Sequence, residues 1–555
     1  MEIMNKRGEK RKMKKKMKQE KAITLIALVI TIIVLLILAA ISIATLTGEN
    51  GILTKATNAK AETIKAQEKE QIELAYLSAQ TKKMGNGSNE AITSTDLNEE
   101  FNNSNVLAEA QNDSQGGMKV TFRETKNEYS IDSKGRVTEL TNTGEEMLTD
   151  GSWTGEVNSP NLMENMTAVY WDASNNEKKL TSTSTTEEWN NWYQYIAGDN
   201  ETDTKTSKWA NATTSDGSYW VWIPRYEYKI TAASSTTASE TNAGKIEVKF
   251  IPTTQTTADT GYTIHPAFTA NVNNGGWTSE LDGIWVAKYE MSMETSGIAT
   301  IIEDTDSGNV AISDTIKMVS KPNVSSWKYI NIANSYTNSY NYDRAKESHL
   351  MKNSEWGAVA YLTHSQYGRN GNEVTINNSS SYITGNAGES VSASEAPETI
   401  NAYNTAAGML ASSTGNIYGI YDLSGGEWER VAAFNSAYTG TYFTGADYLD
   451  AEGNHFASTG GESTRYATAY NNSTSTYYED FTVGTVSMIG DAIQEVYVSL
   501  DKGWFNDHSN FVYAKFPFFN RGGGYYDGSY AGIFYSDETS GRVGRSGFRV
   551  VLVGV

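Results

Sequence analysis

About three-quarters of the way along the chain, the sequence reads Asn416-Ile417-Tyr418-Gly419-Ile420-Tyr421-Asp422-Leu423-Ser424-Gly425-Gly426-Glu427-Trp428-Glu429. Glycine tolerates positive φ and the close approach of another backbone, so Gly425 and Gly426 predict a tight turn. Trp428 carries a large apolar surface that we expect in the core. Asp422 and Glu427 lie beside it, and we expect their carboxylates to cap backbone N–H groups. This stretch therefore predicts a packed turn that leads into a core strand.

Four further motifs lie on either side of this stretch: Asp282-Gly283-Ile284-Trp285-Val286-Ala287-Lys288-Tyr289-Glu290, the helix-like Ser348–Leu362 around Trp356, Arg521-Gly522-Gly523-Gly524, and Gly547-Phe548-Arg549. Arginine forms bidentate pairs with carboxylates, so we expect Arg521 and Arg549 to tie the last strands to Asp422 and Glu427. Short apolar runs predict strands at Tyr219–Pro224, Ile246–Ile251, Ile284–Tyr289 and Phe548–Val553.

Taken in order, these motifs resemble the formylglycine-generating enzymes and their sulfatase-modifying-factor relatives, a branch of the C-type lectin fold. The resemblance implies an α+β chain in which residues 151–555 form one large C-type-lectin-like domain. Residues 151–280 are either an N-terminal elaboration of that domain or a separate module. The resemblance also implies a structural role for the motif residues Trp356, Asp422, Gly425, Gly426, Trp428, Arg521, Gly522, Gly523, Phe548 and Arg549.

Between Arg521 and Arg549 the chain alternates Tyr, Ser, Asp and Gly. Rigid aromatic rings mixed with small polar groups are typical of antibody-like binding loops. The layout resembles the variable C-termini of retroelement-diversified proteins, which implies that the exposed, ligand-contacting positions are Tyr525, Tyr526, Asp527, Ser529, Tyr530, Tyr535 and Ser536. We expect Trp504 and Asp507, with Asn506 and His508, to line the same face. The alternative is that these tyrosines pack inside the domain.

The chain contains no cysteine, which excludes disulfides and the cysteine-pair chemistry of formylglycine generation. No G-x-S-x-G elbow is present, and the five histidines lack the spacing of a helical metal pair. We therefore expect no enzyme activity and no certain cofactor. Ca²⁺ is the one metal ion that we retain, with Asp422, Asp507 and Asp527 as its candidate ligands. A metal-dependent enzyme on the same scaffold remains an alternative.

Charge is distributed unevenly along the chain. Residues 1–21 carry ten Lys or Arg against three Glu, and the formal charge of −21 therefore leaves −28 for the rest. An acidic body argues against a nucleic-acid partner. The basic leader, residues 1–22, precedes an apolar run over residues 23–46, which as a helix spans roughly 36 Å, enough for a bilayer core of about 30 Å. The positive flank predicts a single-pass protein of the cell membrane with its C-terminal part outside, whereas a cleaved secretory signal is the rival interpretation.

The residues around this junction, Lys21-Ala22-Ile23-Thr24-Leu25-Ile26, resemble a type IV prepilin N-terminus. The resemblance implies cleavage between Ala22 and Ile23 and methylation of the new amine. Ala22 stands where glycine is usual and Ala27 where glutamate is usual, which puts incorporation into a fibre in doubt. A plain signal anchor is the alternative. Residues 47–89 predict a helical stalk, and residues 90–150 a small pilin-like α/β head whose strands include Met118–Phe122 and Glu128–Ile131.

These observations favour a membrane-anchored surface protein that binds a protein or glycan ligand through its C-terminal domain, without catalysis. A structural role as a minor pilin or pseudopilin, with pilin-like assembly, is the second hypothesis.

Overall fold

The structure is a computed structural model of the chain, and it describes residues 52–85, 91–104, 106–112, 117–123, 128–131, 135, 137–140, 157–181, 183–198, 207–232, 243–380, 383–388, 400–437, 461–473, 489–499 and 501–554. The predicted leader and membrane helix, including Ala22 and Ile23, lie outside the described residues. The chain divides between Glu145 and Glu146 into two compact units, which we call the small unit and the large unit.

The first described element of the small unit is the long helix α2, Ile52–Gly85. Its sequence is rich in Ala, Lys, Glu and Gln, which are strong helix formers. Ile72, Ala75 and Ala79 follow helical spacing and are buried. The helix ends at Gly85, a residue type that favours helix termination.

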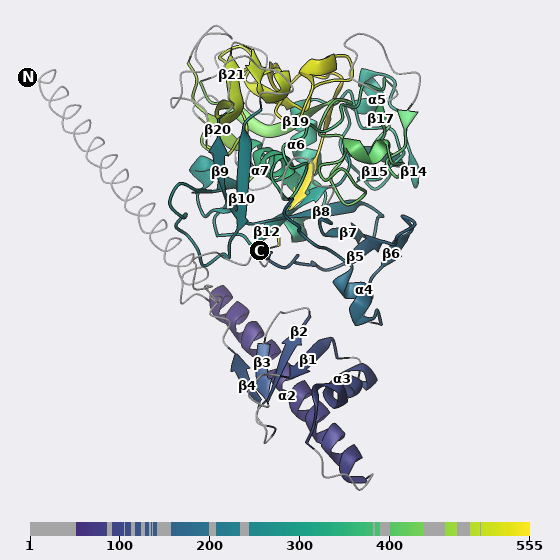
Figure 1. The fold of residues 1–555 in the computed structure, drawn as a ribbon. Helices are drawn as coiled ribbons and strands as arrows, with labels where there is room; N and C mark the ends of the chain where they lie inside the picture. The colour runs from purple at the N-terminus through teal and green to yellow at the C-terminus, as the bar shows by residue number, and fades with distance from the viewer. Residues whose placement is uncertain are drawn as a thin grey trace, which may run out of the picture. The chain divides into compact units, whose positions relative to one another are not determined.

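A short helix and one sheet complete the small unit, drawn purple and blue in Figure 1. Helix α3, Ser94–Asn103, starts with a capping box in which Thr93 and Asp96 satisfy each other's backbone N–H groups. The sheet is antiparallel in the order β1-β2-β3-β4, with bounds Ala108–Asn112, Met118–Phe122, Glu128–Ile131 and Val137–Leu140. Alternate residues such as Val120 and Phe122 face a core that also contains Leu97 and Phe101.

The large unit is built mostly from β-sheets. Its main sheet has seven antiparallel strands in the order β16-β26-β12-β8-β7-β5-β6, with bounds His349–Leu350, Val550–Leu552, Gly283–Ala287, Tyr219–Pro224, Asn211–Thr214, Met166–Trp171 and Glu177–Lys179. Strands β5 to β8 come from residues 151–280, so this segment belongs to the same sheet as β12 and β26 and is not a separate module.

Tryptophans fill the centre of this sheet. Trp222 on β8 is paired in register with Trp285 on β12, and their rings lie 5.3 Å apart. Trp220 on β8 is also fully buried. Both predicted strands therefore contribute tryptophan side chains with large apolar surfaces to the core.

A second sheet positions the C-terminal loops. It has the path β20-β19-β23-β24, with β25 also paired to β19, and the bounds are Thr468–Tyr470, Trp428–Asn435, Phe518–Arg521, Ser536–Thr539 and Ser546–Phe548. Its pairs are antiparallel except β19 with β20 and β19 with β25. In Figure 1 this sheet lies in the green and yellow part of the large unit.

Smaller sheets and short helices complete the large unit. The sheets are β10-β9-β11 (Lys245–Phe250, Tyr226–Thr231, Thr263–Ile264), β14-β13-β15 (Ile298–Ala299, Ser292–Thr295, Ile316–Val319), β17-β18 (Ala387–Gly388, Ile400–Asn401) and β21-β22 (Tyr497–Ser499, Lys502–Gly503). The helices are α4 to α7 (Thr186–Asn190, Thr305–Gly308, Ile332–Asn341, Asn353–His364) and the 3₁₀ turns η1 to η7 (Pro266–Phe268, Val272–Asn274, Arg344–Lys346, Gly408–Ala411, Gln494–Val496, Trp504–Asn506, Gly528–Tyr530).

Helix α7 is the helix predicted around Trp356, and all twelve of its residues are buried. The indole N–H of Trp356 donates to the carbonyl of Ile533 at 2.8 Å. A side chain at Gly357 would clash with the carbonyl of Gly490, only 1.9 Å from an added Cβ. The helix is therefore packed on all sides, in agreement with the structural role expected for Trp356.

Lys288 is fully buried directly after β12. Its ammonium group donates to Asn211 Oδ1 at 2.8 Å and to the carbonyls of Ile417 and Gly419 at 2.5 and 2.9 Å. The ring of Trp171 lies 4.8 Å away. Burial lowers the pKa of Lys288 well below its usual value. Hydrogen bonds to three oxygens satisfy this buried donor and connect β12, β7 and the turn at 417–419.

The chain is thus a mixed α+β protein with many sheets and few helices, in agreement with the predicted class. Across the residues that the structure describes, we find no helix with the length and apolar character needed to span a membrane.

Candidate functional site

Two buried arginines hold the C-terminal strands. Arg549 forms the predicted bidentate pair, but with Glu429: its Nη2 and Nε lie 2.5 and 3.0 Å from the carboxylate oxygens. Arg521 instead donates to the carbonyls of Asp491 and Ala492 at 2.9 and 3.0 Å. The expected pairing of these arginines with Asp422 and Glu427 is therefore wrong, because Arg549 pairs with Glu429 and Arg521 donates through its Nη atoms to main-chain carbonyls.

Asp422 caps backbone donors, as predicted. It lies in the left-handed region at φ 63° and accepts the N–H of Gly385 at 2.8 Å and of Glu290 at 3.4 Å. Burial raises the pKa of Asp422 to about 7, although Arg549 opposes the shift. Glu427 does not cap a backbone donor: its Oε1 is buried and has no hydrogen-bond partner within the described ranges.

The glycines of the two central motifs meet in the structure. Gly425, Gly426, Gly522 and Gly523 all have positive φ. The N–H of Gly425 donates to the carbonyl of Gly522 at 2.9 Å, and a Cβ on Gly523 would lie 2.6 Å from Ala531. Side chains are excluded here because the two turns and the following loop approach too closely.

This framework fixes the loop between β23 and β24 through its main chain. The N–H of Tyr525 donates to the carbonyl of Gly426 at 2.8 Å, and the N–H of Gly524 donates to Asp527 Oδ2 at 2.8 Å. At the other end of the loop, the N–H of His508 donates to the carbonyl of Tyr530 at 2.9 Å. The loop is therefore held in one conformation while several of its side chains point away from the core.

The outward-facing residues of this loop form what we call the tyrosine surface: Tyr525, Tyr526, Asp527, Ser529 and Tyr530. Tyr526 and Tyr530 are 46 and 47 % exposed, and the other three are half-buried. The ring of Tyr526 meets Trp428 and Tyr525 edge to face, at 5.0 Å in each case. Trp428 was expected in the core but is only half-buried, and its indole N–H donates to Asp527 Oδ2 at 2.8 Å.

Four residues predicted for this face are buried instead. Tyr535 is 3 % exposed and Ser536 is fully buried, so the expectation that both positions are exposed is wrong. Trp504 packs against His364 and Phe534 with 2 % exposure. Asp507 accepts the N–H of Phe534 at 2.9 Å and lies so close to Gly532 that a Cβ there would be 2.1 Å away. These residues support the loop from beneath.

Carboxyl groups surround the tyrosine surface, and most of them were not predicted as site residues. His508 Nε2 lies 3.5 Å from Asp537 Oδ1. Burial alone would lower the pKa of His508, but Asp537 and the charges of Asp501 and Asp527 outweigh it and raise the pKa. Burial and the neighbouring Asp537 raise the pKa of Glu538 to about 9. The adjacent acids Asp537-Glu538 at the end of the tyrosine-rich segment were the available sequence signal.

The predicted calcium ligands do not form a common site. Asp422, Asp507 and Asp527 each accept backbone N–H groups of different segments. Within the described ranges, no group of three or more His, Cys, Asp or Glu side chains is arranged to hold a metal ion. His265 and His364 are buried, which lowers their pKa values to about 3 and about 4. Ca²⁺ binding therefore stays a prediction without a defined site.

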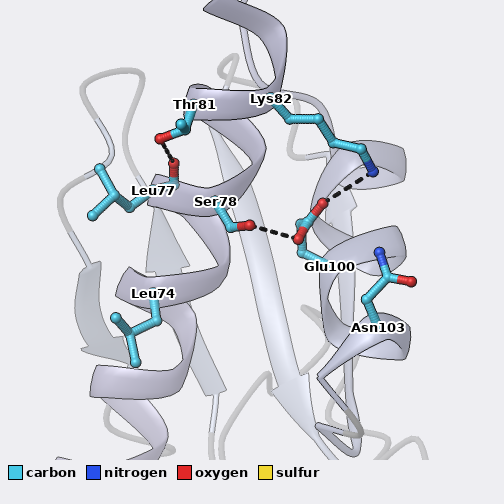
Figure 2. A pocket seen from close by; sticks show the side chains of 7 residues that line it. All are labelled: Leu74, Leu77, Ser78, Thr81, Lys82, Glu100 and Asn103. Carbon is cyan, nitrogen blue, oxygen red and sulfur yellow. Dashed lines mark hydrogen bonds and ion pairs between the residues drawn. The ribbon is translucent and has the colours of Figure 1, made fainter. Parts of the chain in front are cut away.

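A separate hollow lies in the small unit between α2 and α3. Figure 2 shows its lining residues, Leu74, Leu77, Ser78, Thr81, Lys82, Glu100 and Asn103. Ser78 and Lys82 donate to Glu100 at 2.7 and 3.3 Å. Leu74 and Leu77 are 60 and 58 % exposed. The polar groups are thus paired with one another, while α2 leaves two leucines open to solvent.

Comparison with known proteins gives no relative: no protein-family model matches the chain, and no curated protein matches it either.

Proposed function

We propose that this chain is a membrane-anchored surface protein that binds a protein or glycan ligand through a C-type-lectin-like domain of the formylglycine-generating-enzyme branch. In this proposal residues 23–46 anchor the chain and the large unit lies outside the cell. Binding proceeds without covalent chemistry, since the cysteine pair of that enzyme family is absent. The ordered motifs described above support the assignment to this fold.

The observation that carries the proposal is the tyrosine surface. Its main chain is fixed by hydrogen bonds to Gly426, His508 and Asp527, whereas Tyr526 and Tyr530 keep almost half of their surface exposed. Tyrosine offers a large amphipathic contact area at a low cost in side-chain entropy. A preorganised loop also loses little conformational entropy when it binds.

The test uses the full-length chain, solubilised in mild detergent, on glycan arrays and cell-surface protein arrays. We expect Tyr525→Ala, Tyr526→Ala and Tyr530→Ala together to abolish binding, because hot-spot aromatics dominate interface energies. Tyr262→Ala is the matched control, since this half-buried tyrosine lies in the same unit but on other elements. Equal binding by the triple variant and the parent would overturn the proposal.

A second function, that of a minor pilin or pseudopilin, is favoured by the small unit. There a long helix packs beside a four-stranded antiparallel sheet, an arrangement that resembles a pilin head, and Leu74 and Leu77 remain exposed. Recovery of the chain in sheared surface fibres, and its loss from them in Leu74→Gln/Leu77→Gln, would support this function. Retention of both proteins in the membrane fraction alone would argue against it.

A further inference from the structure

We infer that the tyrosine surface receives cationic groups, the lysine or arginine side chains of a basic protein partner. The inference rests on the proposed binding function and names the chemistry of its ligand.

The aromatic rings provide the first argument. Trp428 and Tyr526 meet at an interplanar angle of 86°, and Tyr525 and Tyr526 at 89°. In an edge-to-face pair the edge of one ring meets the face of the other. The negative face of an aromatic ring attracts ammonium and guanidinium groups, and Tyr526 and Tyr530 keep almost half of their surface exposed. The chain itself already uses such a contact here, since Lys502 Nζ lies 5.9 Å from the ring centre of Tyr530.

Two buried carboxyl oxygens without a hydrogen-bond donor among the described residues provide the second argument. Glu427 is 3 % exposed, and its buried Oε1 accepts no hydrogen bond from any described residue. Its carboxyl lies close enough to Tyr526 to help raise the pKa of that phenol to about 12, after burial and Asp527. Asp501 Oδ1 is likewise buried without a partner in the part of the chain that the structure describes. A buried acceptor without a donor costs free energy, and the charge of a cation bound nearby offsets part of that cost.

The balance of charge provides the third argument. The carboxyl groups that surround the rings are Glu427, Asp501, Asp527, Asp537 and Glu538. The charged groups that face them are Lys328, Lys502, Arg545 and the imidazole of His508. Five carboxyl groups face four basic groups, but the raised pKa values of Glu427 and Glu538 keep these two largely uncharged at neutral pH, so the local negative charge grows as the pH rises. The chain beyond residue 21 carries −28 in total. Such a field attracts basic partners and repels acidic ones.

The same groups predict how binding depends on pH. Burial raises the pKa values of Glu427, Asp501, Asp527 and Glu538, so these groups gain negative charge as the pH rises. His508 loses its positive charge as the pH rises. Both changes favour a cation. Affinity for a lysine-containing partner is therefore expected to rise between about pH 5 and about pH 9, whereas affinity for a neutral glycan changes little.

The probe is an array of lysine-rich peptides and the identical array with every lysine acetylated, which removes the charge and keeps the sequence. A neutral glycan array is tested beside them. The protein is the full-length chain in mild detergent. We expect binding to the unmodified peptides, loss of that binding on acetylation, and weakening by added salt.

The informative variant is Asp501→Asn/Asp527→Asn. Asparagine tolerates the left-handed conformation of Asp501 at φ 61° and still accepts the Trp428 and Gly524 N–H groups at position 527. We expect about a tenfold or greater loss of affinity for the peptides. The matched control, Glu187→Gln/Asp306→Asn, removes the same formal charge at exposed sites on α4 and α5 and is expected to bind normally.

The remaining outcomes separate this inference from the function beneath it. Equal binding to both peptide arrays, or binding to the glycan array alone, would overturn the inference that the partner is cationic. The proposed binding function would still stand if the tyrosine variants lost the signal. An equal loss of peptide affinity in the control variant would also overturn the inference, because the effect would then depend on the net charge of the protein and not on the tyrosine surface. Binding to none of the three arrays would count against both proposals.

Discussion

Asp422 shows how one buried carboxyl group couples this fold to pH. Its folded-state pKa of about 7 lies above its ordinary value of 3.8, chiefly because burial disfavours the charged form. Its contribution to stability is therefore complete below about pH 4 and is lost as the pH rises through about 7. The buried carboxyls of Glu290 and Glu429 are shifted upward as well, so they act in the same direction.

Asp422→Asn tests this coupling. Asparagine adopts positive φ and accepts the same backbone N–H groups, yet it cannot ionise. We expect the free energy of unfolding of the parent to fall between about pH 4 and about pH 7. The slope of the variant should be shallower, and the two slopes should differ by at most about 1.4 kcal/mol per pH unit, the largest contribution of one titrating group. Denaturant titrations across this pH range measure the slope. Exposed Asp306→Asn is the control, and identical slopes for parent and Asp422→Asn would contradict the prediction.

Single residues also mark where sequence reasoning stops. Tyr530 and Tyr535 share a residue type and a local composition, yet one is 47 % and the other 3 % exposed. The difference arises because the loop turns inward after Gly532, which lies against Asp507. Such a turn depends on contacts between segments that are distant in sequence. The types of residue at the site were therefore predictable, but not which of them reach the surface.

At the level of elements, the loop between β23 and β24 depends on Gly523. Two effects act at this position, a left-handed backbone at φ 76° and the close approach of Ala531. Gly297, in the two-residue turn between β13 and β14, has nearly the same φ, 78°, but nothing within 4 Å of an added Cβ. The two glycines therefore separate backbone strain from steric clash.

We expect Gly297→Ala to cost about 1–2 kcal/mol, the left-handed strain alone, and Gly523→Ala to cost more. Only Gly523→Ala is expected to weaken ligand binding, because it displaces the tyrosine surface. Thermal unfolding and the array signal measure the two effects independently. Equal destabilisation by both substitutions would show that the loop yields to the added methyl group.

Elements with a strong local signal were predicted well. Helix α2 and strand β8 agree with the predicted segments, and α7 covers most of the helix predicted around Trp356. The parallel pairing of β19 with β25 was not predicted, because strand order depends on long-range packing and not on local periodicity.

At the scale of the whole molecule, the described residues form two separate hydrophobic cores. Phe101 is fully buried among Leu97 and Val120 in the small unit, and Phe519 is fully buried in the large unit. The predicted boundary between residues 90–150 and residues 151–555 lies close to this division. The order of the motifs pointed to one large domain, but the sequence alone left residues 151–280 unassigned, since only strand pairing shows that they join the main sheet.

Two cores predict two unfolding transitions. Phe101→Ala is expected to destabilise the small unit by about 3–5 kcal/mol and to leave the transition of the large unit unchanged. Phe519→Ala is expected to do the reverse. Differential scanning calorimetry of the full chain resolves both transitions. A single transition that shifts with either substitution would show that the units unfold together.

The carbonyl cage around Lys288 has a practical consequence for following the protein over time. An acylating reagent needs a free amine in water, and this amine reaches water only when β12 separates from the turn at 417–419. Lys288 should therefore be among the last lysines labelled, at a rate set by spontaneous opening of the large unit. Mass spectrometry of that one peptide would then serve as an internal clock for the lifetime of the native state, without an added dye or tag.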